Sequence, residues 1–100
     1  MQLQIPINLS LVREICRRWG VRELSVFGSA IREDFRPDSD LDLLVSFVPG
    51  ASLSLFDLMA FREQLEAVAG RKVDLVEREA LHNPFRRASI LAHREILYAA

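Results

Sequence analysis

The sequence predicts an α/β (α+β) domain in which helices pack on a small β-sheet. Short apolar segments of strand length alternate with segments of helical periodicity, and glycines or capping residues mark most of the boundaries. The expected order of elements is α-β-(short α)-β-α-β-α. One hundred residues suit a single domain spanning residues 1–100, with too few residues for a separate substrate-binding lobe.

Three segments have the spacing of amphipathic helices. Apolar residues recur at i, i+3, i+4 and i+7 from Val12 to Trp19, a second helix is expected over 55–69, and a last one from Asn83 to about Tyr98. The boundaries are supported by residues that cap or stop helices, namely Gly20, Ser54 with Asp57, Gly70, Asn83 and Pro84. The apolar faces are Leu55, Leu58, Met59, Leu65 and Val68 in the second helix, and Phe85, Ala88, Ala92 and Ile96 in the last, which is expected to pack on the sheet.

Three apolar segments are expected to be strands, at residues 24–27, 40–47 and 72–76. Gly28-Ser29 interrupts the chain after the first strand, and Pro49-Gly50 ends the second. The polar stretch from Arg32 to Asp38 separates these two strands and is expected to contain the short helix.

Composition limits the classes of function. Thirteen basic residues against fourteen acidic ones give a net charge of −1, which argues against broad electrostatic binding of nucleic acid. Cys16 is the single cysteine, so no internal disulfide can form, and this fits a reducing cytoplasm. No signal peptide and no apolar run near the ~18 residues of a membrane helix are found, so we expect a cytoplasmic protein that does not bind a membrane.

Gly28-Ser29 is the first candidate for chemistry. A glycine directly after a strand lets the backbone turn sharply and approach a ligand, and a helix that starts at Ser29 would direct free N–H groups at an anion. The pair therefore predicts phosphate binding, with an ordinary turn as the alternative.

Asp40-Leu41-Asp42 is the second candidate. Side chains alternate along a strand, so Asp40 and Asp42 are expected on one face and the apolar residues on the other. Two adjacent carboxylates repel each other, and a divalent cation such as Mg²⁺ or Mn²⁺ removes that repulsion. The alternative is a pair of hydrated acids at the end of a strand.

Asp74 is the third candidate, because acidic residues are depleted from apolar strands such as 72–76. An edge strand with one hydrated face is the alternative explanation. All three candidates can contact one ligand under two conditions. The strand before Gly28 must run antiparallel to the strand of Asp42. The strand of Asp74 must lie beside the strand of Asp42, with Asp74 and Asp42 on the same face of the sheet. Phosphate donors next to three carboxylates are what two-metal phosphoryl transfer requires.

Gly28-Ser29, ten residues and then Asp40-Leu41-Asp42 resemble the GS-x10-DxD signature of the DNA polymerase beta-like nucleotidyltransferase superfamily. Residues 27–32, 37–45 and 71–76 resemble its minimal nucleotidyltransferase (MNT) branch, and the likeness covers nearly the whole chain. Glu33 is a departure, because the family often has glycine after the arginine that matches Arg32. A side chain at position 33 is expected to affect the affinity for nucleotide rather than the metal site.

The resemblance implies a mixed sheet flanked by helices, two Mg²⁺ ions (or Mn²⁺) and an NTP donor, expected to be ATP. Asp40 and Asp42 would bind both metals, and Asp74 would bind the one that activates the acceptor hydroxyl. Gly28, Ser29 and Arg32 would bind the phosphates. The reaction implied is transfer of a nucleoside monophosphate, expected to be AMP, with release of pyrophosphate.

MNT proteins that resemble this chain commonly pair with a helical HEPN protein as antitoxin and toxin, and act by binding the toxin, by adenylylating it, or both. The resemblance therefore implies a HEPN-type toxin partner, and leaves a homo-oligomer open. Two hypotheses follow. The first is a nucleotidyltransferase that modifies a protein, with a small molecule such as an aminoglycoside or an RNA end as less favoured acceptors. The second is a catalytically quiet module that neutralises the partner by contact. The intact Asp40, Asp42, Asp74 and Gly28-Ser29 favour the enzyme.

Overall fold

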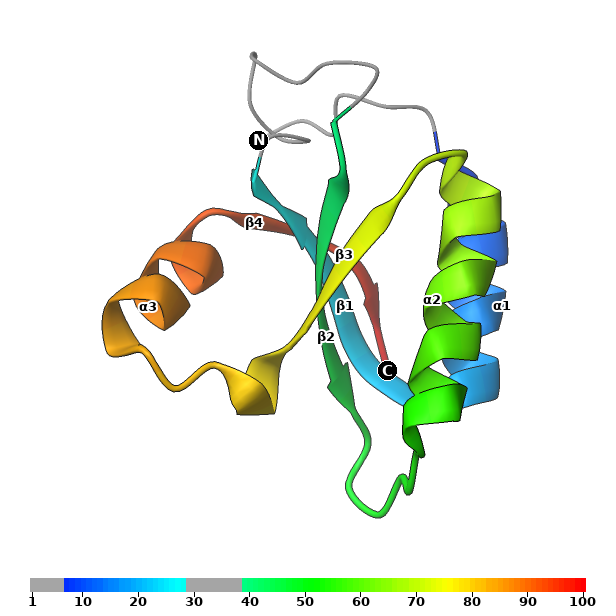
Figure 1. The fold of residues 1–100 in the computed structure, drawn as a ribbon, viewed down its shortest axis with the longest axis horizontal. Helices are drawn as coiled ribbons and strands as arrows, with labels where there is room; N and C mark the ends of the chain where they lie inside the picture. Colours follow the sequence, from blue (N-terminus) through cyan, green and yellow to red (C-terminus); the bar gives the residue numbers. More distant parts are fainter. Residues whose placement is uncertain (1–6, 29–38) are drawn as a thin grey trace.

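The computed structural model describes residues 7–28 and 39–100 (Figure 1). The short helix expected between the first two strands falls on residues 29–38 and lies outside the described residues. The elements in chain order are α1 (Leu9–Trp19), β1 (Val21–Phe27), β2 (Leu41–Phe47), α2 (Leu55–Ala69), β3 (Val73–Glu77), the 3₁₀ turn η2 (Arg78–Ala80), α3 (Pro84–Ala92) and β4 (Arg94–Ala99).

The strands form one sheet in the order β3-β2-β1-β4. β1 pairs antiparallel with both β2 and β4, whereas β2 and β3 run parallel. The expected mixed sheet flanked by helices is therefore confirmed, and so is the antiparallel pairing of the first two strands. Because of these directions, the end of β1 and the starts of β2 and β3 meet at one end of the sheet, the upper end in Figure 1.

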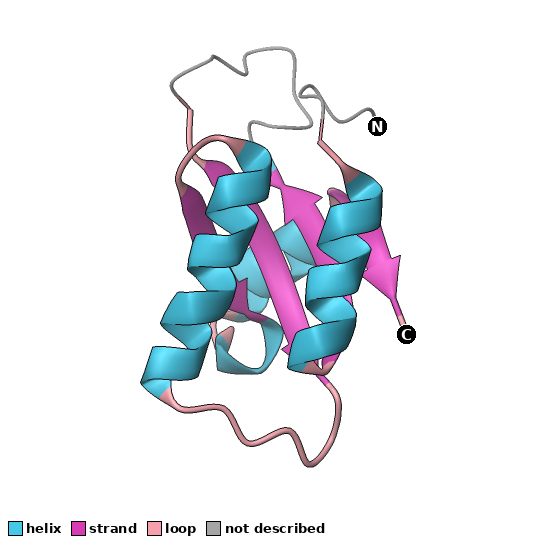
Figure 2. Ribbon diagram, turned by 90° about the vertical axis from the view of Figure 1, so that its right-hand side faces the viewer, coloured by secondary structure: helices cyan, strands magenta, loops and turns pink. Residues whose placement is uncertain are grey.

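Helices α1 and α2 lie side by side on one face of the sheet (Figure 2). The main core lies between these layers, and its fully buried members include Cys16, Leu24, Val45 and Phe61. Helix α3 lies on the opposite face, where a second and smaller core is formed by Phe27, Leu44, Leu81 and Ile90. Alternation along β2 explains this division, because Leu43 and Val45 belong to the first core and Leu44 to the second.

The predicted ends of α1 and α2 and the predicted start of α2 are confirmed. The side chains of Ser54 and Asp57 each accept a hydrogen bond from the other residue's backbone N–H, at 3.1 and 2.9 Å, and complete the capping box of α2. Gly20 and Gly70 end α1 and α2 in the left-handed conformation. In α2 the expected packing face is confirmed for Leu65 and Val68, which pack in the main core, and is wrong for Leu55, which is 71% exposed. Phe61 is instead fully buried, against Trp19 and Phe47.

The last predicted helix is wrong beyond Ala92. The structure ends α3 there, and residues 94–99 form β4 on the free edge of β1. This strand buries Leu97 in the main core and satisfies backbone groups of β1 that would otherwise lack ladder partners. The expected packing face is also wrong, because Phe85 is 85% exposed and Ile96 51% exposed; Ile90 is the buried residue of α3.

No helix of the described part of the chain is long and apolar enough to cross a membrane.

Candidate active site

Gly28 and Asp42 meet where β1 ends and β2 begins. Phe27 is the antiparallel partner of Asp42, so the following residue, Gly28, lies directly beside the aspartate. Gly28 has a φ of +71°, and a Cβ there would lie 3.1 Å from Cγ of Asp42 and closer still to its Oδ2. Glycine is therefore required twice, once for the left-handed backbone and once for the space that the Asp42 carboxylate occupies.

Asp42 and Asp74 are register partners across the parallel strands β2 and β3. Paired residues of neighbouring strands lie on the same face of a sheet about 4.8 Å apart, so their carboxylates project side by side. Asp42 is half-buried and Asp74 exposed. β3 is an edge strand, which agrees with the alternative explanation of Asp74 as a hydrated residue on such a strand. Its register also places Asp74 next to Asp42.

Asp40 lies one residue before β2 and is exposed. The backbone on either side of it is tied to the start of β3: Arg71 donates from Nη1 to the carbonyl oxygen of Ser39 at 3.3 Å, and the N–H of Leu41 donates to the carbonyl oxygen of Lys72 at 2.9 Å. Asp40 therefore belongs to the same end of the sheet as Asp42 and Asp74.

The residues at this end fit a divalent cation by their donor chemistry, because carboxylate oxygens suit Mg²⁺ and Mn²⁺. The space that Gly28 leaves open admits the Asp42 carboxylate beside the turn. In residues 7–28 and 39–100, however, no three His, Cys, Asp or Glu side chains are grouped closely enough to hold a metal ion. The described structure thus brings Gly28, Asp42 and Asp74 together, and does not group Asp40, Asp42 and Asp74 as a three-carboxylate site.

Ser29 and Arg32, the other predicted phosphate-binding residues, lie outside the described residues. So does Glu33.

A polar network lies on the α3 face of the sheet, the face that also carries Asp42, and runs from Arg94 back along β1. Arg94 forms an ion pair with Glu23 and donates from Nη1 to Oγ of the fully buried Ser25 at 3.0 Å. Arg78 lies 3.8 Å from the same glutamate. The sequence gives no sign of this network, because Arg94 falls within the segment that was expected to be the last helix, and its partners lie about 70 positions away in the chain.

Cys16 can be excluded from the chemistry. It is completely buried in the main core, and burial raises the pKa of its thiol to about 12. The thiol therefore stays protonated near neutral pH and cannot act as a nucleophile or a metal ligand.

Comparison with known proteins agrees with this geometry. The nucleotidyltransferase domain family model matches residues 9–97. Protein adenylyltransferase MntA of Thermococcus cleftensis is 40% identical over 86 residues, which cover 86% of this chain and 82% of that protein.

Two solved structures show the same fold. One, named as a candidate minimal nucleotidyltransferase, is 37% identical with a TM-score of 0.71, over 86% of this chain and 85% of that one. The other is a complex of a tri-AMPylated HEPN toxin of Shewanella oneidensis with its MNT antitoxin, at 16% identity and a TM-score of 0.65, over 92% of this chain and 70% of that one.

A mixed sheet that gathers a glycine turn and paired aspartates at one end, together with these matches, defines a nucleotidyltransferase. Within that class, the chain belongs to the minimal nucleotidyltransferase family, which includes MntA-type proteins.

Proposed function

We propose that this protein is a metal-dependent protein adenylyltransferase, which transfers AMP from ATP to a hydroxyl group of a partner protein. The observation that carries the proposal is the convergence of Gly28, Asp42 and Asp74 from three neighbouring strands at one end of the sheet. The similarity to an MntA adenylyltransferase supports AMP as the group transferred.

The aspartates have distinct roles in this proposal. Asp40 and Asp42 would bind both Mg²⁺ or Mn²⁺ ions, and Asp74 would bind the one that activates the acceptor hydroxyl. Bound divalent ions would neutralise charge on the phosphates and make the attacking hydroxyl more acidic. Asp42 carries its carboxylate against the Gly28 turn, so the acid and the proposed phosphate-binding loop approach the same ligand.

The phosphates are bound by the turn that follows β1. Backbone N–H groups at Gly28 and the hydroxyl of Ser29 hold the terminal phosphates, and Arg32 assists as a charged donor. The acceptor oxygen then bonds to the α-phosphorus, the bond from that phosphorus to the pyrophosphate oxygen breaks, and the hydroxyl proton passes to Asp74.

The proposed acceptor is a HEPN-type toxin, for which this protein is the antitoxin. The Shewanella oneidensis complex supports this choice, because there an AMPylated HEPN toxin is bound to an MNT antitoxin of the same fold.

The test is to incubate the protein with labelled ATP, Mg²⁺ and the HEPN-type protein from its own gene neighbourhood. We expect AMP to be attached to a hydroxyl side chain of that protein, with release of pyrophosphate and with no transfer in EDTA. Tight binding of the neighbour without any transfer would refute the enzyme and favour neutralisation by contact.

A further inference from the structure

We propose that Arg71 is a positioning residue, which fixes the backbone around Asp40 so that its carboxylate is held at the nucleotide end of the sheet. This inference rests on the proposed function, in which Asp40 is a metal ligand.

The need for such a residue follows from where β2 begins. Asp42 lies inside the ladder, paired with Phe27 on one side and Asp74 on the other. Asp40 precedes the first strand residue, Leu41, and is exposed. Strand pairing therefore fixes the direction of the Asp42 side chain but does not extend to Asp40.

Two hydrogen bonds bracket Asp40 from consecutive residues at the start of β3. The guanidinium Nη1 of Arg71 donates to the carbonyl oxygen of Ser39 at 3.3 Å, and the carbonyl oxygen of Lys72 accepts from the N–H of Leu41 at 2.9 Å. One bond holds the residue before Asp40 and the other the residue after it. The first depends on a side chain, so substitution can remove it without deleting either partner of the second, which is then expected to open more often.

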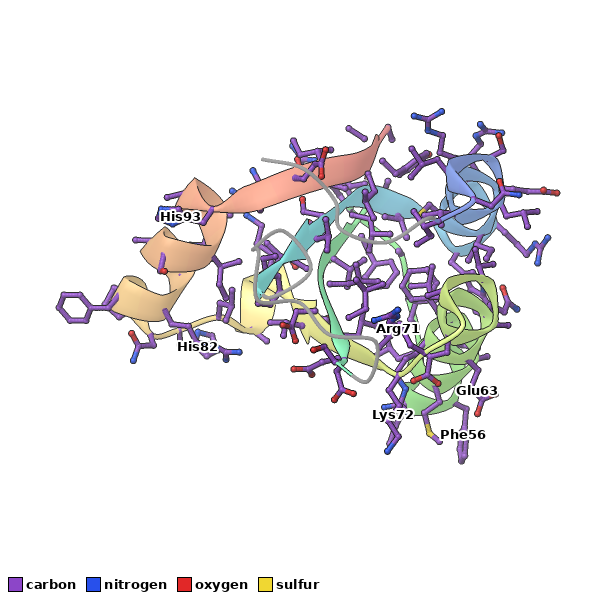
Figure 3. All side chains as sticks on the ribbon, turned by 90° about the horizontal axis from the view of Figure 1, so that it is seen from above. Phe56, Glu63, Arg71, Lys72, His82 and His93 are labelled. Carbon is purple, nitrogen blue, oxygen red and sulfur yellow. The ribbon has the colours of Figure 1, made fainter. Side chains whose placement is uncertain are left out.

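The chain directs Arg71 to this place. Gly70 ends α2 with a φ of +70°, and the turn that follows brings Arg71 toward the space between the sheet and α2, whereas Lys72 points outward (Figure 3). Arg71 is half-buried, with its Nε buried, and Lys72 is exposed. The N–H of Val73 donates to Oε2 of Glu66 at 2.9 Å, which fixes the same segment to α2.

A residue that orients a metal ligand affects the affinity for the metal more than the stability of the fold. Loss of such contacts typically costs about 10–100-fold in metal affinity. Arginine suits this position because its rigid, planar fork directs a donor at a fixed carbonyl, whereas lysine offers a single ammonium on a flexible stem.

The experiment compares wild type with Arg71→Gln, Arg71→Lys and the control Lys72→Gln, which removes a positive charge one position away on an exposed side chain. The first readout is hydrogen exchange of the Leu41 amide, which donates to Lys72, in the metal-free protein. The second is the affinity for Mn²⁺ in the presence of saturating AMP-PNP, followed by electron paramagnetic resonance. Thermal unfolding of each variant reports on the fold.

We expect the Leu41 amide to exchange at least about tenfold faster in Arg71→Gln, and this variant to bind Mn²⁺ about 10–100-fold more weakly. Lys72→Gln is expected to match wild type in both readouts, and Arg71→Lys to lie between. If Arg71→Gln does not fold, Arg71→Met, which keeps most of the aliphatic stem, is measured in its place with the same expectation.

Unchanged exchange of the Leu41 amide, or wild-type affinity for Mn²⁺, in a folded Arg71→Gln protein would overturn the proposal. A general structural role would also overturn it, and would lower thermal stability and accelerate exchange throughout β3 rather than at this amide. If wild type itself binds AMP-PNP without any effect of Mn²⁺, the proposed metal chemistry fails, and with it the role of Arg71 toward the metal.

Discussion

A Cβ on Gly28 would lie within 3.1 Å of Cγ of Asp42, so the turn after β1 and the carboxylate on β2 cannot vary independently. The relationship explains why glycine and aspartate occur together in this protein. It also provides a test that separates backbone strain from crowding of the carboxylate.

Gly28→Ala should destabilise the protein by about 1–2 kcal/mol through its left-handed backbone and should also displace the Asp42 carboxylate. Gly70→Ala is the matched control, because its φ is +70° and an added Cβ would meet nothing within 4 Å. We expect both variants to lose a similar amount of free energy of unfolding in urea titrations. Only Gly28→Ala is expected to lose Mg²⁺-dependent nucleotide binding. Wild-type nucleotide binding by Gly28→Ala would show that the contact has no role in the site.

Asp42→Asn should remove most of the difference between nucleotide affinity in Mg²⁺ and in EDTA, because the amide is a poor ligand for a hard cation. The fold should be retained, since the change also removes repulsion from the adjacent Asp74. Titration calorimetry measures both affinities, with Glu63→Gln on the exposed face of α2 as the control. Equal binding with and without metal in wild type would contradict the proposed cation site.

Much of this site could be predicted from local sequence. The strand segments, the capping box of α2 and the antiparallel arrangement that joins Gly28 to Asp42 follow from alternation, from caps and from the need to meet one ligand. The fourth strand could not be predicted in this way. Residues 94–99 continue a segment with a good helical N-cap at Asn83, and what makes them a strand is the free edge of β1, some 70 residues earlier in the chain. The contact of Arg71 with Ser39 escapes prediction for the same reason, because it depends on which strands become neighbours.

Arg94→Met should destabilise the protein by about 2–3 kcal/mol, because it leaves Glu23 without its closest cation and Ser25 without a donor in a largely buried setting. Arg86→Met, on the exposed surface of α3, should change the free energy of unfolding by less than about 0.5 kcal/mol. Urea titration distinguishes the two. Equal stability of these variants would mean that Arg94 is solvated, as it would be on the outer face of a longer helix.

The Cys16 thiol should be unreactive toward a thiol reagent at pH 8 in the native protein and should react at once in urea, because burial raises its pKa from 9.0 to about 12. As the pH rises, the Cys16 thiol loses its proton in the unfolded chain before it does so in the folded protein. The contribution of the protonated thiol to the free energy of unfolding is therefore complete below about pH 9 and is lost as the pH rises toward 12. Cys16→Ala should remove this part of the pH dependence, at the cost of a small cavity. Rapid labelling of the native thiol at pH 8 would contradict its burial.

The paired aspartates are proposed to carry out AMP transfer rather than only to bind a partner, and Asp74→Asn separates these two roles. The substitution keeps the shape of the side chain, and Asp74 is exposed on an edge strand, so the protein should fold and bind ATP. In a single-turnover assay with labelled ATP and the HEPN-type partner, we predict AMP transfer that is about 10²–10³-fold slower than wild type. Glu77→Gln, further along the same strand, should transfer AMP at the wild-type rate. Equal rates for wild type and Asp74→Asn would contradict the account.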